Sequence, residues 1–215
     1  MMIKAVLFDL DGTLVNSLGD LAASVNFVLE RNGFPVHAED EFRYFAGDGI
    51  PKMIERALPE NCRTEEIKHR CTEQFLERYS KHFADLTRPY PGIPELLEGL
   101  RRRGIETAVV SNKAQEMAEC VVKRAFGDRM SLIIGKREGV AAKPDPAALL
   151  LAAKLLGKEP RECAFLGDSG MDMAAAVRAG MKAVGVLWGF RTAKELEENG
   201  AEALIKTPGE LTDII

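Results

Sequence analysis

The sequence predicts an α/β fold in which helices cover both faces of a mainly parallel sheet. Three observations support this. The chain begins with a short apolar strand at residues 3–8, and from residue 92 onward predicted helices and strands alternate. Between them lies a segment with helical periodicity and no convincing strand. Alternating strands and helices are typical of a parallel sheet, whose strands are apolar because both of their faces are buried.

The first strand ends in two aspartates, Asp9 and Asp11, followed by Gly12 and Thr13. Side chains alternate between the faces of a strand, so the two carboxylates are expected on the same side. Open α/β sheets place their ligands at the carboxyl ends of strands. A carboxylate pair there can hold a divalent cation and divide the roles of nucleophile and proton donor. The alternative for this segment is a strand that ends in a solvated acidic turn.

Residues 16–87 form a helical insertion, in which apolar residues such as Leu18, Leu21 and Val25 recur at helical spacing. We therefore predict a core of residues 1–15 and 88–215 and a helical cap of residues 16–87. An insertion just after the aspartates predicts a lid, although an ordinary helical subdomain has the same pattern. Within it, Gly47, Asp48 and Gly49 are candidates for a substrate loop, because glycine allows close backbone approach. A helix-start turn capped by an aspartate fits this triplet equally well.

The remainder of the chain completes the sheet. Punctuation by glycine and proline near residue 92 marks the return to alternating structure. Helices are predicted at 93–103, 114–126, 146–156, 171–179 and 193–199, and strands at 105–110, 131–134, 163–166, 182–186 and 203–205.

Polar residues follow three of these elements. Ser111 and Asn112 come after a strand and before a helix, where hydroxyl and backbone N–H groups form phosphate sites, although the pair would also cap a helix. Lys143 precedes a proline and could reach in from a loop as a fixed positive charge, whereas most lysines are simply solvated. Asp168 follows a strand, and Asp172 lies one helical turn later, so the two carboxylates form a second acidic cluster. Alone, Asp172 could merely favour the helix N-terminus.

The amino-acid composition argues against proteins that bind nucleic acids or membranes. The 215 residues include 29 basic and 33 acidic side chains, and a net charge of -4 gives no general attraction to nucleic acid or anionic membranes. Four cysteines without a CxxC pair, and no recognisable signal sequence or long apolar span, favour a cytoplasmic protein. We expect a monomer or homodimer with no nucleic-acid or membrane partner.

Together the motifs carry a family resemblance. DLDGTLVNS from Asp9, VVSNK from Val109, KPDP from Lys143 and LGDSGMD from Leu166 occur in the order typical of the haloacid dehalogenase-like hydrolases. The resemblance implies a Rossmann-like core with a cap between the first and second motifs. The second aspartate, Asp11, points to the phosphatases and phosphomutases within this superfamily. Segments 45–58, 167–181 and 183–190 are most similar to phosphoglycolate phosphatases.

The resemblance also implies roles in catalysis. Asp9 would be the nucleophile that forms an aspartyl phosphate, and Asp11 would be the general acid and base. Lys143 would neutralise the nucleophile and the phosphoryl group, while Ser111 and Asn112 would bind the phosphate.

Mg²⁺ is the implied cofactor. Its ligands would be Asp9, Asp168, Asp172 and the backbone carbonyl of Asp11. The implied partner is a small phosphorylated metabolite, 2-phosphoglycolate, which would yield glycolate and phosphate. Alternatives are a sugar phosphomutase similar to β-phosphoglucomutase, a pyrophosphatase, or a non-catalytic binding protein on the same fold.

Overall fold

In the computed structural model, which describes residues 2–47 and 49–215, the chain divides into two compact units. One unit combines Met1–Asn16 with Pro89–Ile215 and contains the sheet. The other is the helical segment Ser17–Arg88. Short strands β2 (Val15–Asn16) and β3 (Arg88–Pro89) pair with each other where the chain passes from one unit to the other.

The sheet unit is built on six parallel strands in the order β5-β4-β1-β6-β7-β8. The predicted α/β class with a parallel core is thereby confirmed. The strand of the two aspartates lies inside the sheet, between β4 and β6, so its carboxyl end adjoins two other strand ends. The strands are β1 (Ala5–Phe8), β4 (Glu106–Ala114), β5 (Leu132–Lys136), β6 (Cys163–Gly167), β7 (Lys182–Val186) and β8 (Ala203–Ile205).

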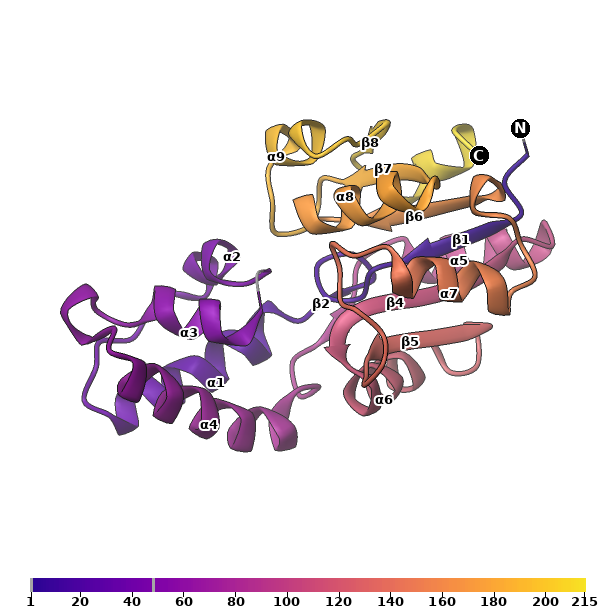
Figure 1. The fold of residues 1–215 in the computed structure, drawn as a ribbon. Helices are drawn as coiled ribbons and strands as arrows, with labels where there is room; N and C mark the ends of the chain where they lie inside the picture. The colour runs from indigo at the N-terminus through magenta and orange to yellow at the C-terminus, as the bar shows by residue number, and fades with distance from the viewer. Residues whose placement is uncertain (1, 48) are drawn as a thin grey trace. The chain divides into compact units, whose positions relative to one another are not determined.

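Helices α7 and α8 pack on one face of this sheet, with α5 behind it (Figure 1). Every residue of β1 is fully buried, as a strand covered on both faces requires. On the α7 and α8 face, Leu7 and Phe165 share one apolar cluster with Leu149 and Met173. The helices of this unit are α5 (Ile93–Arg102), α6 (Gln115–Phe126), α7 (Ala147–Leu155), α8 (Gly170–Ala179) and α9 (Ala193–Glu198), with 3-10 turns at Pro160–Glu162 and Pro208–Asp213.

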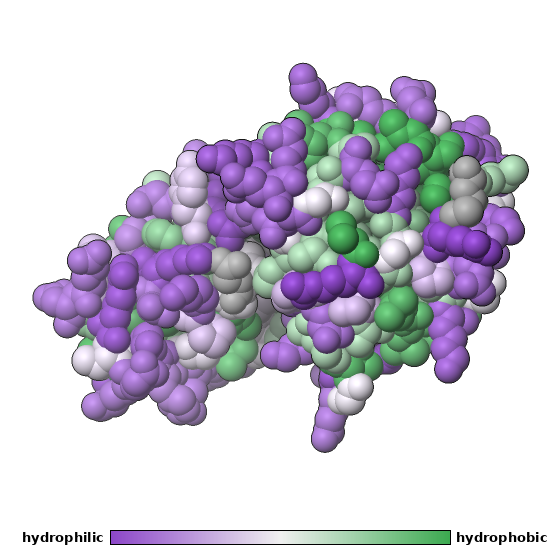
Figure 2. All heavy atoms as spheres, turned by 45° about the horizontal axis from the view of Figure 1, so that its top comes forward, coloured by the Kyte–Doolittle hydropathy of each residue, from purple (hydrophilic) through white to green (hydrophobic). Residues whose placement is uncertain are grey.

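The helical unit has its own core. Its longest helices, α1 (Leu18–Arg31) and α4 (Glu65–His82), pack together and bury residues such as Val28 and Phe75. Its visible surface is largely hydrophilic (Figure 2). The other elements are α2 (Phe42–Phe45), α3 (Ile50–Ala57) and 3-10 turns at Glu39–Glu41 and Glu60–Cys62.

A buried carboxylate ties the end of the helical unit to its beginning. Asp20, in the first turn of α1, accepts hydrogen bonds from the backbone N–H of Leu86 at 2.9 Å and from the N–H and hydroxyl of Thr87 at 2.8 and 2.6 Å. These bonds fix the segment in which the chain leaves the unit beside the helix with which it enters.

Candidate active site

The turn after β1 brings Asp9 and Asp11 to the carboxyl edge of the sheet. The backbone N–H of Asp9 donates to the carbonyl of Leu166 at 2.8 Å, so Asp9 continues the register between β1 and β6. Gly12 then adopts a φ of 89°, and a Cβ atom there would lie 2.3 Å from Oδ2 of Asp168. Glycine is therefore required both by the turn and by the close approach of a second carboxylate.

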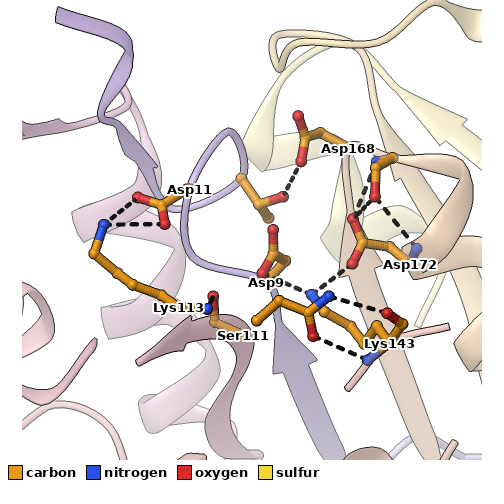
Figure 3. Close-up of polar contacts among 10 residues, drawn as sticks. Asp9, Asp11, Ser111, Lys113, Lys143, Asp168 and Asp172 are labelled. Atoms are coloured by element: carbon orange, nitrogen blue, oxygen red, sulfur yellow. Dashed lines mark hydrogen bonds and ion pairs between the residues drawn. The ribbon is translucent and has the colours of Figure 1, made fainter. Parts of the chain in front are cut away.

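Three carboxylates and one ammonium group meet at this edge (Figure 3). Oxygen atoms of Asp9, Asp168 and Asp172 all lie within 4.8 Å of one another, and all three residues are buried. The Nζ atom of Lys143 donates to Oδ1 of Asp9 at 2.7 Å and to Oδ1 of Asp172 at 2.6 Å. The cluster thus contains one buried ammonium group and three buried carboxyl groups.

Two of these acids, Asp9 and Asp168, have a raised pKa, mainly because they are buried. Burial raises the pKa of Asp9 to about 7, because it outweighs the opposing effect of Lys143. Burial, reinforced by the neighbouring Asp172 and Asp9, raises the pKa of Asp168 well above its usual value. Burial would lower the pKa of Lys143, but Asp172 and Asp9 together raise it, so this side chain stays charged. A site that disfavours its own carboxylates in this way is suited to a bound cation.

Neighbouring groups orient the two later acids. Asp172 lies in the first turn of α8, where its Oδ2 accepts from the N–H and hydroxyl of Ser169 at 3.0 and 2.6 Å. Oδ2 of Asp168 accepts from the backbone N–H of Phe190 at 2.8 Å. Each acid therefore has one oxygen fixed by the protein, and the other is directed at a different partner: Lys143 for Asp172, and the Thr13 hydroxyl at 3.4 Å for Asp168.

The segment after Val110 differs from the prediction. The strand does not end at residue 110; β4 continues to Ala114 with an irregularity in its pairing to β5. Ser111 is buried and its Oγ accepts from the N–H of Lys113 at 3.2 Å. The side-chain amide of Asn112, which we predicted to bind the phosphate, bonds the backbone of Lys143.

Two residues that contact the turn after β1 had no role assigned from the sequence. Lys113 places its ammonium group 3.1 and 3.2 Å from the two carboxylate oxygens of Asp11. Trp188 donates from its indole nitrogen to the carbonyl of Thr13 at 3.0 Å. The SNK motif was a signal for Lys113, whereas nothing local marked Trp188, because its partner lies 175 residues away.

The glycine triplet of the helical unit is only partly described. Gly47 and Gly49 have φ values of 107° and 88°, and Gly49 immediately precedes α3. Asp48 lies outside the described residues. A helix therefore starts at this triplet, but its N-cap is Gly49 and no side chain caps it. The substrate role of the triplet stays a prediction.

Comparison with known proteins decides the family. A haloacid dehalogenase-like hydrolase model matches residues 3–180, which include every site residue of the sheet unit up to Asp172. The chain belongs to the haloacid dehalogenase-like hydrolases. The family resemblance predicted from the four motifs is thereby confirmed.

Individual relatives of this haloacid dehalogenase-like hydrolase are similar along its whole length. A phosphoglycolate phosphatase of Chromobacterium violaceum is 36% identical over 217 residues, covering 99% of this chain and 96% of that protein. An N-acetylmuramic acid 6-phosphate phosphatase of Pseudomonas aeruginosa is 33% identical, covering 100% and 96%. The crystal structure of a candidate phosphoglycolate phosphatase from Lactobacillus delbrueckii subsp. bulgaricus superposes with a TM-score of 0.93 at 29% identity, covering 100% and 99%.

The described residues of this hydrolase, 2–47 and 49–215, contain no helix that is both long and apolar enough to cross a membrane.

Proposed function

We propose that this protein is a Mg²⁺-dependent phosphatase that hydrolyses a small phosphomonoester, 2-phosphoglycolate, to glycolate and phosphate. The observation that carries the proposal is the buried cluster of Asp9, Asp168 and Asp172 around Lys143, with Asp11 two residues from Asp9. The relatives named as phosphatases support the reaction class, and those named as phosphoglycolate phosphatases support the substrate.

The acidic cluster fits a hard divalent cation. It supplies oxygen ligands, which Mg²⁺ prefers. The pKa values of Asp9 and Asp168 are raised, mainly by burial and also by neighbouring carboxylates, and a bound cation would offset both effects. Asp9, Asp168 and the backbone carbonyl of Asp11 would hold the ion, with Asp172 as a further ligand or as support. When bound, Mg²⁺ would reduce the repulsion between the carboxylates and the phosphate dianion.

The first half-reaction transfers the phosphoryl group to Asp9. An Asp9 oxygen attacks phosphorus, the bond between phosphorus and the leaving oxygen breaks, and Asp11 donates a proton to that oxygen. Lys143 offsets charge on the nucleophile and the transferring group. The Ser111 hydroxyl and nearby backbone N–H groups bind phosphoryl oxygens, where negative charge is greatest.

The second half-reaction restores the enzyme. Asp11 takes a proton from water, the water oxygen attacks phosphorus, and the bond between phosphorus and Asp9 breaks to release phosphate. Asp11 and Asp9 thereby return to their starting states. Lys113, paired with Asp11, lies where it can hold this carboxylate near its working position.

We propose that the helical insertion acts as a cap that selects the substrate, with residues 47–49 as its specificity loop.

Free thiols at all four cysteines support a cytoplasmic location, where thiols remain reduced. We expect the protein to act as a monomer or homodimer.

The test is phosphate release with and without Mg²⁺ from 2-phosphoglycolate, N-acetylmuramic acid 6-phosphate, hexose phosphates, nucleotides and pyrophosphate. A preference for 2-phosphoglycolate that is lost in Asp9→Asn supports both reaction and substrate. A requirement for a sugar bisphosphate activator would favour a phosphomutase, and preferred cleavage of pyrophosphate would favour a pyrophosphatase. Failure to hydrolyse any phosphate compound would contradict the proposed function.

A further inference from the structure

Lys143 reaches the centre of the site from irregular backbone. It lies in a turn between β5 and α7, where no helix or strand ladder fixes the chain. Loop backbone is in general more mobile than regular structure. Yet the ammonium group must be held between two carboxylates, at 2.7 and 2.6 Å. The backbone of Lys143 therefore needs an anchor outside its own turn.

Asn112 provides this anchor with both ends of its side-chain amide. Its Nδ2 donates to the backbone carbonyl of Lys143 at 3.0 Å, and its Oδ1 accepts from the backbone N–H of the same residue at 2.9 Å. A side-chain amide carries the same donor and acceptor groups as a peptide unit, so this pair replaces the missing strand partner. Asn112 is itself on β4, a strand in the interior of the sheet.

A third bond to the turn comes from the outside. The exposed side chain of Arg178 donates to the carbonyl of Pro144 at 2.9 Å. An exposed hydrogen bond competes with water and contributes little net stability. Arg178 is therefore a matched control, since it bonds the neighbouring residue but leaves the N–H and carbonyl of Lys143 untouched.

We propose that Asn112 is a positioning residue that acts through Lys143, and that its side chain is not a phosphate ligand. By fixing both polar groups of the Lys143 backbone to β4, it sets the distance from which the ammonium group reaches Asp9. Loss of the amide frees the turn and moves the charge away from the phosphoryl group. The inference deepens the proposed phosphatase function and rests on it for its kinetic part.

A double-mutant cycle tests the kinetic part, with p-nitrophenyl phosphate as the probe substrate. Misplacing a catalytic group by about 1 Å costs about 100-fold in rate, so Asn112→Ala should lower kcat by about 10- to 100-fold and change KM by less than about 3-fold. In a Lys143→Ala background, the same substitution should lower kcat by less than about 3-fold, because the group that it positions is already absent. Arg178→Ala should change kcat by less than about 3-fold.

Hydrogen exchange of the Lys143 amide tests the placement without any reaction. Peptides that span residues 140–146 should exchange faster in Asn112→Ala than in the wild type, with no such change in Arg178→Ala. Unchanged exchange would overturn the anchor. Two results would overturn the action through Lys143. One is a raised KM with unchanged kcat in Asn112→Ala, and the other is a fall in kcat in the Lys143→Ala background as large as that in the wild-type background. A wild type that hydrolyses no phosphate ester would refute the proposed function, and the exchange would still decide the anchor.

Discussion

Replacing Asp9 by Asn should stabilise the metal-free protein at pH 8, although it removes the proposed nucleophile. The pKa of this carboxyl rises from 3.8 to about 7, mainly because it is buried. Between these values the unfolded chain releases the proton and the folded chain keeps it. Stability from this group is therefore complete below about pH 4 and is lost as the pH rises through 7.

The magnitude follows from the pKa change. One pKa unit corresponds to about 1.4 kcal/mol, so holding Asp9 charged costs the folded state up to about 4 kcal/mol at pH 8. Asn fills nearly the same volume without the charge, and its oxygen can still accept from Lys143. In a chain of this size 1 kcal/mol corresponds to about 2–4 °C in Tm, so the rise could reach about 10 °C.

The assay is thermal unfolding in EDTA at pH 5 and pH 8, followed by circular dichroism. The variant should exceed the wild type at pH 8 and differ less at pH 5, and added Mg²⁺ should raise the Tm of the wild type more than that of the variant. Asp11→Asn is the matched control, because its side chain is partly exposed and paired with Lys113, and it should not raise the Tm. An unchanged or lower Tm for Asp9→Asn at pH 8 would refute the argument.

Two further predictions concern burial and close approach. Burial raises the pKa of Cys163 to about 11. At pH 8 a thiol reagent such as dithionitrobenzoate should therefore label the exposed Cys120 rapidly, and Cys163 only after denaturation. Rapid labelling of Cys163 in the native protein would contradict this. Gly12→Ala places a Cβ atom 2.3 Å from Asp168 and should abolish Mg²⁺-dependent activity and weaken Mg²⁺ binding measured by calorimetry. Gly33→Ala, at a φ of 72° with nothing within 4 Å, should cost only about 1 kcal/mol of backbone strain and leave both unchanged.

The parts of the site that the sequence predicted depend on one property of parallel sheets. Asp9, Ser111 and Asp168 each come directly after an apolar run that predicts a strand, and parallel strands that share a sheet end at the same edge. Strand positions alone therefore predict that the three residues lie at the same edge of the sheet, but not that they are neighbours. The strand order β4-β1-β6 then made the three neighbours.

What could not be predicted depends on contacts between distant segments. β4 continues to Ala114 because its pairing with β5 resumes after an irregularity. Nothing in the sequence of residues 105–114 predicts this irregularity. The amide of Asn112 is equally suited to a phosphate, a helix N-terminus or a loop backbone. The fold decides among these by bringing Lys143 within 3.0 Å of it.

The burial that disfavours the charged forms of Asp9 and Asp168 also determines which ligands the site can accept. A phosphate dianion entering beside three carboxylates would meet repulsion that one ammonium group cannot offset. The site therefore favours the substrate only when a second source of positive charge is present, and Lys143 must stay close enough to serve both Asp9 and the incoming oxygen atoms. A small movement of that lysine would weaken the positive field where transition-state charge develops, because Coulomb interactions are strong in a buried site. The bonds that hold the Lys143 backbone matter to the reaction for this reason, even though they touch neither acid nor substrate.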